Sequence, residues 1–400
     1  MFAPLTGVRV VDLTHVLAGP YCTQLLANFG AEVIKVEPPG TGDLTRFGGP
    51  LPELNEHQLG LAFCTQNSDK ASVTVNLKEP AGIDIVKRLV ARADVFVENF
   101  RPGVAGRLGL SFDALCEVKP DLVYVSLTAY GQDGPIGHRP AYDHVVQAMS
   151  GIMETTGTEE TGPIKVGAPY VDYAAGQKGA MATMAALMEQ RRTGESQRVD
   201  AAMLDSTLLL MANTLTATAA TGQRPAKLGN EAASRSPSSG CFETDDGLLA
   251  IAANNERQFR DLCSTIGHPE LADDDRFADR SAREANAELF AAVLRDIFAT
   301  DTAAAWETKL DGAGVPASRV RSLDELLAEG QPAARGLLTP VVLESIDTEV
   351  ALPTAGFKVN DAVPGPVEPP HPLGADTDRV LAELGYTDSE VGELRAGGAI

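Results

Sequence analysis

Two polar motifs hold the side chains whose types and spacing best suit chemistry. The first contains Asp172, which we expect to end a short strand and to begin an Ala-rich helix. An aspartate there is commonly an N-cap, whose side-chain oxygen accepts a free backbone N–H. The same position keeps a carboxylate ionised, so that it can attack an acyl carbon as a nucleophile. The two interpretations are compatible, and Asp172 is the candidate nucleophile.

The second motif contains Tyr142, Asp143 and Gln147, which lie about one turn apart if a helix begins here. Side chains at this spacing share one face of a helix. A purely structural interpretation makes Asp143 a helix cap and Tyr142 a half-buried aromatic residue whose hydroxyl has a partner. We expect the neighbouring His144 to be a structural or surface residue.

The elements that must position these motifs alternate between strands and helices. This β-α-β pattern predicts a parallel sheet covered on both faces, and hence an α/β fold. The expected strands are 8–12, 32–36, 72–77, 95–97, 122–127 and 197–202, and the expected helices are 22–29, 81–93, 174–192 and 202–219.

A change in composition near residue 224 predicts a domain boundary. Residues 224–240 are polar and contain Ser-Pro-Ser-Ser-Gly, which is typical of a linker or loop. We therefore divide the chain into a large domain, 1–224, a smaller and more helical domain, 225–330, and a C-terminal segment, 331–400. In the smaller domain we expect a strand at 248–252 and helices near 256–266, 281–298 and 302–313.

Charge and cysteine content exclude several classes of function. The formal net charge of −22 disfavours nucleic acid and anionic membrane surfaces as partners. The five cysteines are far apart and form no C-x-x-C pair, so neither a disulfide framework nor a metal site is expected. No signal peptide is recognisable at the start of the sequence. A cytoplasmic setting fits these features.

The first β-α-β unit also invites a dinucleotide-binding interpretation, because Glu37 ends the second strand. The turn after the first strand, however, has only Gly19 where that motif needs three glycines. This disfavours a hydride-transfer enzyme. The sequence also lacks a G-x-S-x-G elbow, a P-loop and an H-E-x-x-H motif.

Beyond these single motifs, nearly the whole chain resembles the family III CoA-transferases, the CaiB/BaiF family. That family includes formyl-CoA:oxalate and succinyl-CoA:glutarate CoA-transferases. Besides the two motifs above, the resemblance rests on segments in the same order: 5–14, 30–37, 42–46, 97–103 and 130–135.

The resemblance implies a particular architecture and reaction. A Rossmann-like large domain would include the C-terminal segment, with a smaller α/β domain between, in an interlocked, ring-like homodimer. Asp172 would attack an acyl-CoA to form a mixed anhydride, and the released CoA would convert it to an aspartyl-CoA thioester. The acceptor carboxylate would form a second anhydride, which CoA opens. Acyl-CoA and a carboxylic acid are then the substrates, and no cofactor is bound permanently.

The resemblance also implies candidate substrate contacts. Arg46 is a candidate for the distal carboxylate of the acid, since a guanidinium can bind two oxygens, or else a surface arginine. Lys70 is a candidate phosphate partner, or else a solvated charge at the edge of a strand. The other predicted contacts are Val16, Leu17, Arg107 and Leu108, with Tyr142 and Asp143 near the thioester.

Departures from the family pattern concern the substrate. The oxalate enzyme has glutamine where this chain has Leu17, and a glycine-rich lid where this chain has residues 253–259. Those residues resemble the succinyl-CoA:glutarate type, so we predict succinyl-CoA with a dicarboxylic acceptor.

Two alternatives stay open. An α-methylacyl-CoA racemase is the first, because Glu256 stands at the position of the racemase glutamate, although Tyr142 replaces the histidine base. The second is a non-catalytic acyl-CoA-binding protein, which the presence of Asp172 and Tyr142 disfavours.

Overall fold

The structure, a computed structural model, describes residues 2–234 and 236–400 and divides the chain into two compact units. Unit 1 comprises the chain up to Met153, Lys165–Arg224 and Pro332–Ile400. Unit 2 comprises Glu154–Ile164 and Pro225–Gln331. The sequence assigned residues 154–164 to the large domain, whereas here they pack with unit 2. Their backbone pairs with it, since Leu228 N donates to Thr155 O (3.0 Å).

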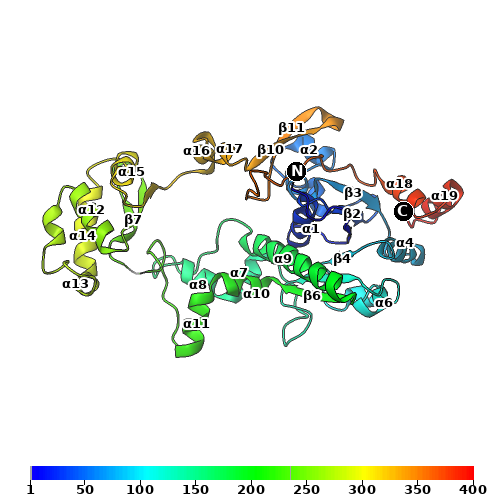
Figure 1. Cartoon of the computed structure of the whole chain (residues 1–400), viewed down its shortest axis with the longest axis horizontal. Coiled ribbons are helices and arrows are strands. Elements are labelled where there is room, and N and C mark those ends of the chain that lie inside the picture. Colours follow the sequence, from blue (N-terminus) through cyan, green and yellow to red (C-terminus); the bar gives the residue numbers. More distant parts are fainter. Residues whose placement is uncertain (1, 235) are drawn as a thin grey trace. The chain divides into compact units, whose positions relative to one another are not determined.

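A six-stranded parallel sheet forms the centre of unit 1 (Figure 1), and the α/β fold class is confirmed. Short runs of Val and Ile make strands that are buried on both faces, as a covered parallel sheet requires. The strand order is β3-β2-β1-β4-β5-β6. The strands are β1 (Arg9–Asp12), β2 (Glu32–Glu37), β3 (Lys70–Thr74), β4 (Val95–Glu98), β5 (Val123–Thr128) and β6 (Gln197–Ala202).

Alternating side chains of these strands enter two separate cores. Val10 joins a core with the helices α1 (Ala18–Asn28) and α9 (Tyr170–Thr193). Val11 points the other way, into a core with α4 (Pro80–Val90) and α18 (Thr377–Glu383). This period of two is the normal consequence of strand geometry.

The glycines of α9 allow it to lie very close to α1. A Cβ atom on Gly176 would come within 2.7 Å of Ala18 O, and one on Gly179 within 2.8 Å of a Leu127 methyl group. A side chain at Gly176 would push α9 away from the α1 backbone, and one at Gly179 would press on Leu127 of β5 and on Cys22 of α1. This close packing fixes the N-terminal turn of α9, which carries Asp172.

Shorter elements complete unit 1. An antiparallel hairpin of β10 (Leu338–Leu343) and β11 (Thr348–Pro353) packs with the helix Leu61–Asn67 through buried Leu and Val side chains. The helical elements are η1 (Leu44–Phe47), α2 (Pro52–Glu56), α3 (Leu61–Asn67), α5 (Val104–Arg107), α6 (Phe112–Cys116), α7 (Asp143–Ser150), α10 (Met203–Leu210), α11 (Ala212–Thr221) and α19 (Asp388–Ala396). The chain crosses between the units within α8 (Ile152–Thr156), after Ile164, after Arg224 and within α17 (Gln331–Ala334).

Unit 2 has its own small sheet and an aromatic core. The antiparallel strands are β7 (Ser239–Glu243), β8 (Leu248–Ala252) and β9 (Ala317–Arg319). Phe259, Phe290 and Trp306 lie in the core, each at most 5% exposed. The helical elements are α12 (Glu256–Thr265), η2 (Pro269–Ala272), α13 (Arg280–Ala285), α14 (Ala287–Phe298), α15 (Ala303–Gly312) and α16 (Leu323–Ala328).

Several predicted elements differ from the structure. The first helix begins at Ala18 rather than Cys22, because Pro20 is tolerated in a first turn that needs no N–H from it. The helix predicted at 202–219 is interrupted at Met211, and no strand precedes Asp172. Within the described residues, no helix is long and apolar enough to span a bilayer.

Candidate active site

A cleft of about 480 Å³ lies at the carboxyl ends of β1, β4 and β5. The sheet order changes direction between β1 and β4, because β1 leads to β2 on one side and β4 leads to β5 on the other. Ligands of open α/β sheets bind at such a switch point, where successive loops turn away from each other. Asp172 and Tyr142 both line this cleft. The two motifs singled out from the sequence therefore meet in one site.

Asp172 is the third residue of α9, and Pro169 occupies the N-cap position. Asp172 therefore lies inside the helix and the N-cap interpretation does not apply to it; its side chain is half-buried. Burial, and secondly the charge of Asp143, raise the pKa of Asp172 to about 7. A carboxyl group with such a pKa, in a cleft, is a recognised mark of a functional residue. It is also more nucleophilic when ionised than an ordinary solvated carboxylate.

Asp143 caps α9 from a neighbouring helix. Its Oδ2 accepts hydrogen bonds from Val171 N (2.8 Å) and Asp172 N (3.3 Å), which belong to the first turn of α9. Gln147 is fully buried; it donates to Asp143 Oδ1 and accepts from Val166 N (2.8 Å). The shared face expected for Asp143 and Gln147 therefore exists, and it orients the turn that carries Asp172. The N–H groups of residues 171 and 172 are occupied by this cap.

Tyr142 and a tight turn form further walls of the cleft. The side chain of Tyr142 is 63% exposed, which rules out the half-buried aromatic interpretation. Val16 and Leu17 line the opposite part of the cleft, within the turn that joins β1 to α1. Val16 has a φ of 73°, in the left-handed region that β-branched residues rarely adopt.

The structure also identifies cleft residues that the sequence did not single out. Asn99 clamps the backbone of His15: His15 N donates to Asn99 Oδ1 (2.9 Å) and Asn99 Nδ2 donates to His15 O (2.8 Å). Arg101 and Arg139 line the cleft, and neither has an ion-pair partner in the part of the chain that is described. The sequence offered one signal for these arginines: Arg101 lies in the 97–103 segment of the family resemblance, and Arg139 lies just before Tyr142.

Arg107 and Leu108 do not line the cleft. Both lie at the end of α5, where Leu108 packs against the core of the sheet and Arg107 is exposed. The Arg107 guanidinium folds back over Gly103, where an added Cβ would lie 3.3 Å from Nη1. Their predicted contacts with CoA remain proposals.

The predicted ligand roles of Arg46 and Lys70 are wrong for this structure, because both side chains are buried. Arg46 forms two hydrogen bonds with Glu37 (2.8 and 2.6 Å) and lies over the Phe63 ring. Lys70 Nζ is 3.2 Å from Asp12 Oδ2 and also donates to Pro20 O (2.9 Å). Neither the ligand interpretation nor the surface-charge alternative fits these contacts.

Arg46 is therefore expected to act on stability rather than on substrate. Arg46→Met leaves Glu37 as an uncompensated buried charge, which costs about 3–5 kcal/mol of unfolding free energy. Urea denaturation measures this loss, and the KM for the acid should not change in the folded fraction. Arg9→Met is a matched control, because the Arg9–Glu32 pair on the same sheet is exposed and should contribute only about 0–1 kcal/mol. A raised KM for the acid in Arg46→Met, with an unchanged free energy of unfolding, would instead support the predicted ligand role of Arg46.

Glu256 lies in unit 2, in the first turn of α12. Its carboxylate pairs with Arg283, whose side chain is buried and also donates to Phe277 O (2.8 Å). Glu256, Arg283 and Asn254 line a small cavity of about 120 Å³ in this unit. The glutamate is thus held by an ion pair.

Comparison with known proteins agrees with this geometry. The sequence model described as CoA-transferase family III matches residues 5–377. The chain belongs to this family. A mouse relative, succinyl-CoA:glutarate CoA-transferase, is 37% identical over 99% of this chain and 90% of its own length. Acetyl-CoA:oxalate CoA-transferase of Acetobacter aceti is 39% identical over 84% of this chain and 85% of its own length.

A solved structure shares the fold of this family III protein. The crystal structure of a CaiB/BaiF family protein from Brucella suis superimposes with a TM-score of 0.82 at 32% identity. The match covers 96% of this chain and 100% of the other. The two curated relatives are transferases, so the comparisons favour a CoA-transferase over the racemase alternative.

Proposed function

We propose that this family III CoA-transferase moves CoA from succinyl-CoA to a dicarboxylic acid, with Asp172 as the nucleophile. The observation that carries the proposal is a half-buried carboxyl group with a raised pKa, in a cleft at the switch point of the sheet. Succinyl-CoA and glutarate are named for the mouse relative, and oxalate for the bacterial one. These acids are all dicarboxylic, which supports that class of acceptor here.

The proposed reaction exchanges one thioester for another through Asp172. Its carboxylate attacks the thioester carbonyl, the C–S bond breaks, and CoA leaves as a thiolate, giving an acyl-aspartyl anhydride. The thiolate then attacks the aspartyl carbonyl and releases succinate, leaving an aspartyl-CoA thioester. The acceptor carboxylate displaces the thiolate to form a second anhydride. Finally the thiolate attacks the acceptor's carbonyl, which yields the new acyl-CoA and restores the Asp172 carboxylate.

The first step needs help from the protein, because a carboxylate is a far better leaving group than a thiolate. The ordinary pKa values of the two groups differ by about 4–5 units. Raising the pKa of Asp172 narrows that difference and makes expulsion of the thiolate easier. Arg101 and Arg139 are the cationic residues of the cleft, and we assign them to the phosphates of CoA. All chemistry resides in the substrates and Asp172, so the proposal requires no resident cofactor.

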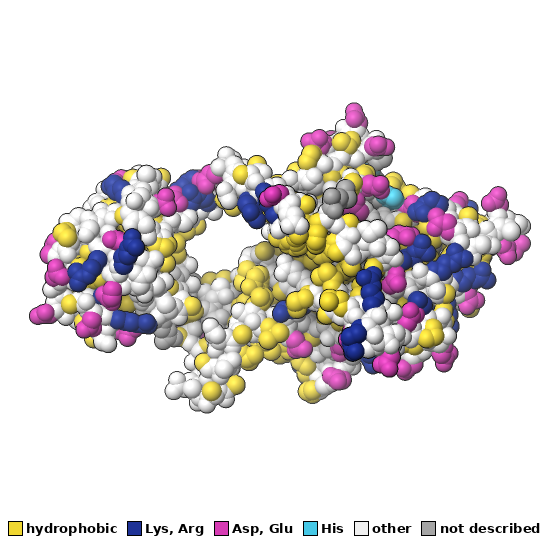
Figure 2. Space-filling model, in the orientation of Figure 1, with side chains coloured by type: hydrophobic (Ala, Val, Ile, Leu, Met, Phe, Trp, Pro, Cys, Tyr) yellow, Lys and Arg dark blue, Asp and Glu magenta, His cyan; other side chains and the backbone are white. Residues whose placement is uncertain are grey.

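We also propose that the enzyme is a homodimer. Large apolar side chains gather over α9 and α10 in the middle of Figure 2. Met181, Met188, Leu209 and Leu210 are 46–74% exposed. Such a patch marks an interaction surface, and a second copy of this chain is the proposed partner. Sedimentation equilibrium should give twice the chain mass of 42.1 kDa; a single-chain mass would refute the dimer.

The five free cysteines fit the cytoplasmic location that we propose. Cys22, Cys64 and Cys263 are buried, and burial raises the pKa of each thiol. None of them is suited to act as a nucleophile.

A substrate panel in D₂O tests the function. The protein is incubated with succinyl-CoA, or with a 2-methylacyl-CoA, and with each of several mono- and dicarboxylic acids, and all thioesters are measured by mass spectrometry. A new acyl-CoA that matches one dicarboxylic acid, and that disappears in Asp172→Ala, supports the transferase and names the acceptor. Deuterium at the α-carbon of the methylacyl-CoA, without a new thioester, would establish the racemase instead.

A further inference from the structure

The turn from Thr14 to Leu17, which lines the cleft, contains a residue in a strained conformation. Val16 has a φ of 73°, although its β-branched side chain disfavours left-handed backbone. Such residues persist only where the surrounding structure holds them in place, and they concentrate at functional sites. Neighbouring residues must therefore hold Val16 in this left-handed conformation.

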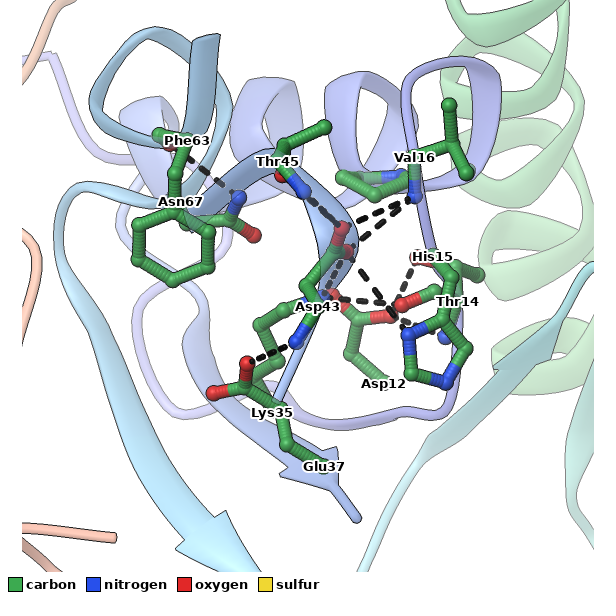
Figure 3. Close-up of polar contacts among 12 residues, drawn as sticks. Asp12, Thr14, His15, Val16, Lys35, Glu37, Asp43, Thr45, Phe63 and Asn67 are labelled. Carbon is green, nitrogen blue, oxygen red and sulfur yellow. Dashed lines mark hydrogen bonds and ion pairs between the residues drawn. The ribbon is translucent and has the colours of Figure 1, made fainter. Parts of the chain in front are cut away.

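Asp43 holds Val16 directly. Val16 N lies 3.3 Å from Asp43 Oδ1 and 3.1 Å from Asp43 Oδ2, and it donates to both (Figure 3). The side chain of Asp43 is fully buried and does not line the cleft. Its Oδ1 also accepts from Thr45 N (3.0 Å) and Thr45 Oγ1 (2.8 Å), which fixes its rotamer. A rigid carboxylate thus lies directly behind the strained residue.

A buried lysine joins Asp43 to Thr14, the first residue of the turn. Lys35 Nζ is 3.3 Å from Asp43 Oδ2 and donates to Thr14 O (2.8 Å). Burial alone would raise the pKa of Asp43, but Lys35 and the hydrogen bonds of Thr45 outweigh it and keep the pKa below its usual value. The carboxylate therefore stays ionised. The ring of His15 completes the group, with Nδ1 3.7 Å from Asp43 Oδ2.

We propose that Asp43 is a positioning residue for acyl-CoA: it holds Val16 in the left-handed conformation, so that the turn is formed before the substrate arrives. Asp43 acts through Val16 and does not touch the ligand. This inference rests on the proposed binding of acyl-CoA in the cleft. Without the tether, Val16 would return to an ordinary conformation, and the fraction of molecules with a competent cleft would fall.

A double-mutant cycle tests this role. In Asp43→Asn the amide NH₂ replaces one of the two oxygens that accept from Val16 N, and the negative charge opposite Lys35 is lost, so the tether is weakened in either orientation of the amide. We expect the Kd for coenzyme A, measured by calorimetry, to rise about ten-fold, and the KM for succinyl-CoA to rise with it while kcat stays nearly constant. Hydrogen exchange in the peptide covering residues 14–17 should accelerate.

Val16→Gly supplies the decisive second arm, because glycine adopts the left-handed conformation without strain. In a V16G background, Asp43→Asn should raise the Kd less than about three-fold. An equal loss in both backgrounds, or no loss in either, would overturn the proposal. If Asp43→Asn alone does not fold, Lys35→Met/Asp43→Asn replaces the whole ion pair, a change that buried pairs often tolerate. The same cycle is then measured on that variant.

Asp69→Asn is the matched control. Its carboxylate also accepts from backbone N–H groups, those of Val367 and Glu368, but the segment that it holds does not line the cleft, whereas Val16 does. Its Kd should equal that of the wild type, and a ten-fold rise would show that the Asp43 effect is unspecific. If the wild-type protein itself does not bind coenzyme A, the proposed function fails. The exchange rates of the turn would still show whether Asp43 holds it.

Discussion

Asp172→Asn is expected to lower kcat by at least about 10³-fold, because removing a nucleophile removes every step that passes through it. The side chain keeps its size and the cleft keeps its arginines. The Kd for coenzyme A should therefore stay within about three-fold of the wild-type value. Steady-state kinetics and calorimetry on the same preparation separate the two effects. Residual activity above about one tenth of wild type would exclude Asp172 as the nucleophile.

The same variant should be more stable than the wild type at alkaline pH. The pKa of Asp172 rises from 3.8 to about 7 on folding, so its ionisation costs stability progressively as the pH rises through this interval, and the cost is complete above the folded pKa. That cost is largest at pH 8 and shrinks as the pH falls towards 4. The melting temperature of Asp172→Asn should thus exceed the wild-type value at pH 8, with the difference declining at lower pH.

Asp205→Asn is the matched control for both measurements. Asp205 is the third residue of α10, as Asp172 is of α9, but it is exposed and does not line the cleft. Neither kcat nor the pH dependence of melting should change. A comparable loss of kcat would mean that the first helical turn, rather than the Asp172 carboxylate, is being tested.

Substitution of Asp143 should also have a large effect on activity, because its carboxylate carries a negative charge near Asp172 and caps the first turn of α9. In wild-type enzyme kcat/KM should fall as the pH drops through about 7, where Asp172 takes up a proton. Asp143→Asn removes the negative charge that helps to raise the pKa of Asp172, so the acidic limb of the pH profile, where kcat/KM falls, should move to lower pH. Asp143→Ala also frees Val171 N and Asp172 N, and we expect kcat to fall about 10–100-fold.

Comparing these two variants separates the two functions of Asp143. The amide of Asp143→Asn can still accept from the first turn of α9, so its kcat should exceed that of Asp143→Ala. A limb that does not move in Asp143→Asn would show that burial alone sets the pKa of Asp172. Equal kcat values for the two variants would contradict the capping role.

Much of the fold was predictable because its strands are short runs of buried Val and Ile separated by clear breaks. The five strands from β1 to β5 and the helix that carries Asp172 follow from that pattern. Breaks inside helical patterns were not predictable. Met211 and Asn286 interrupt helices although neither residue type is a strong breaker, so tertiary packing must decide these ends.

The candidate site was predictable where spacing along one element decides geometry, as for Asp143 and Gln147. It was not predictable where a charge is neutralised by a residue distant in sequence. Arg46 and Lys70 look like ligands because nothing adjacent in the sequence pairs with them. Glu37 ends β2 while Arg46 lies in η1, and Lys70 on β3 reaches across β2 to Asp12 on β1, so each pair joins two different elements. Buried charges of this kind are rare unless paired, so composition favours the exposed interpretation.

Transfer of an oxygen atom from the acceptor acid to Asp172 would show that its carboxylate forms the proposed anhydrides. The enzyme is allowed to turn over succinyl-CoA with a dicarboxylic acid labelled with oxygen-18 in its carboxylates, and the peptide that contains Asp172 is then analysed by mass spectrometry. Because CoA opens the second anhydride at the acceptor's carbonyl, one labelled oxygen must remain on the Asp172 carboxylate. We expect that label on Asp172 alone. Formation of the new acyl-CoA with an unlabelled Asp172 would exclude Asp172 as the nucleophile.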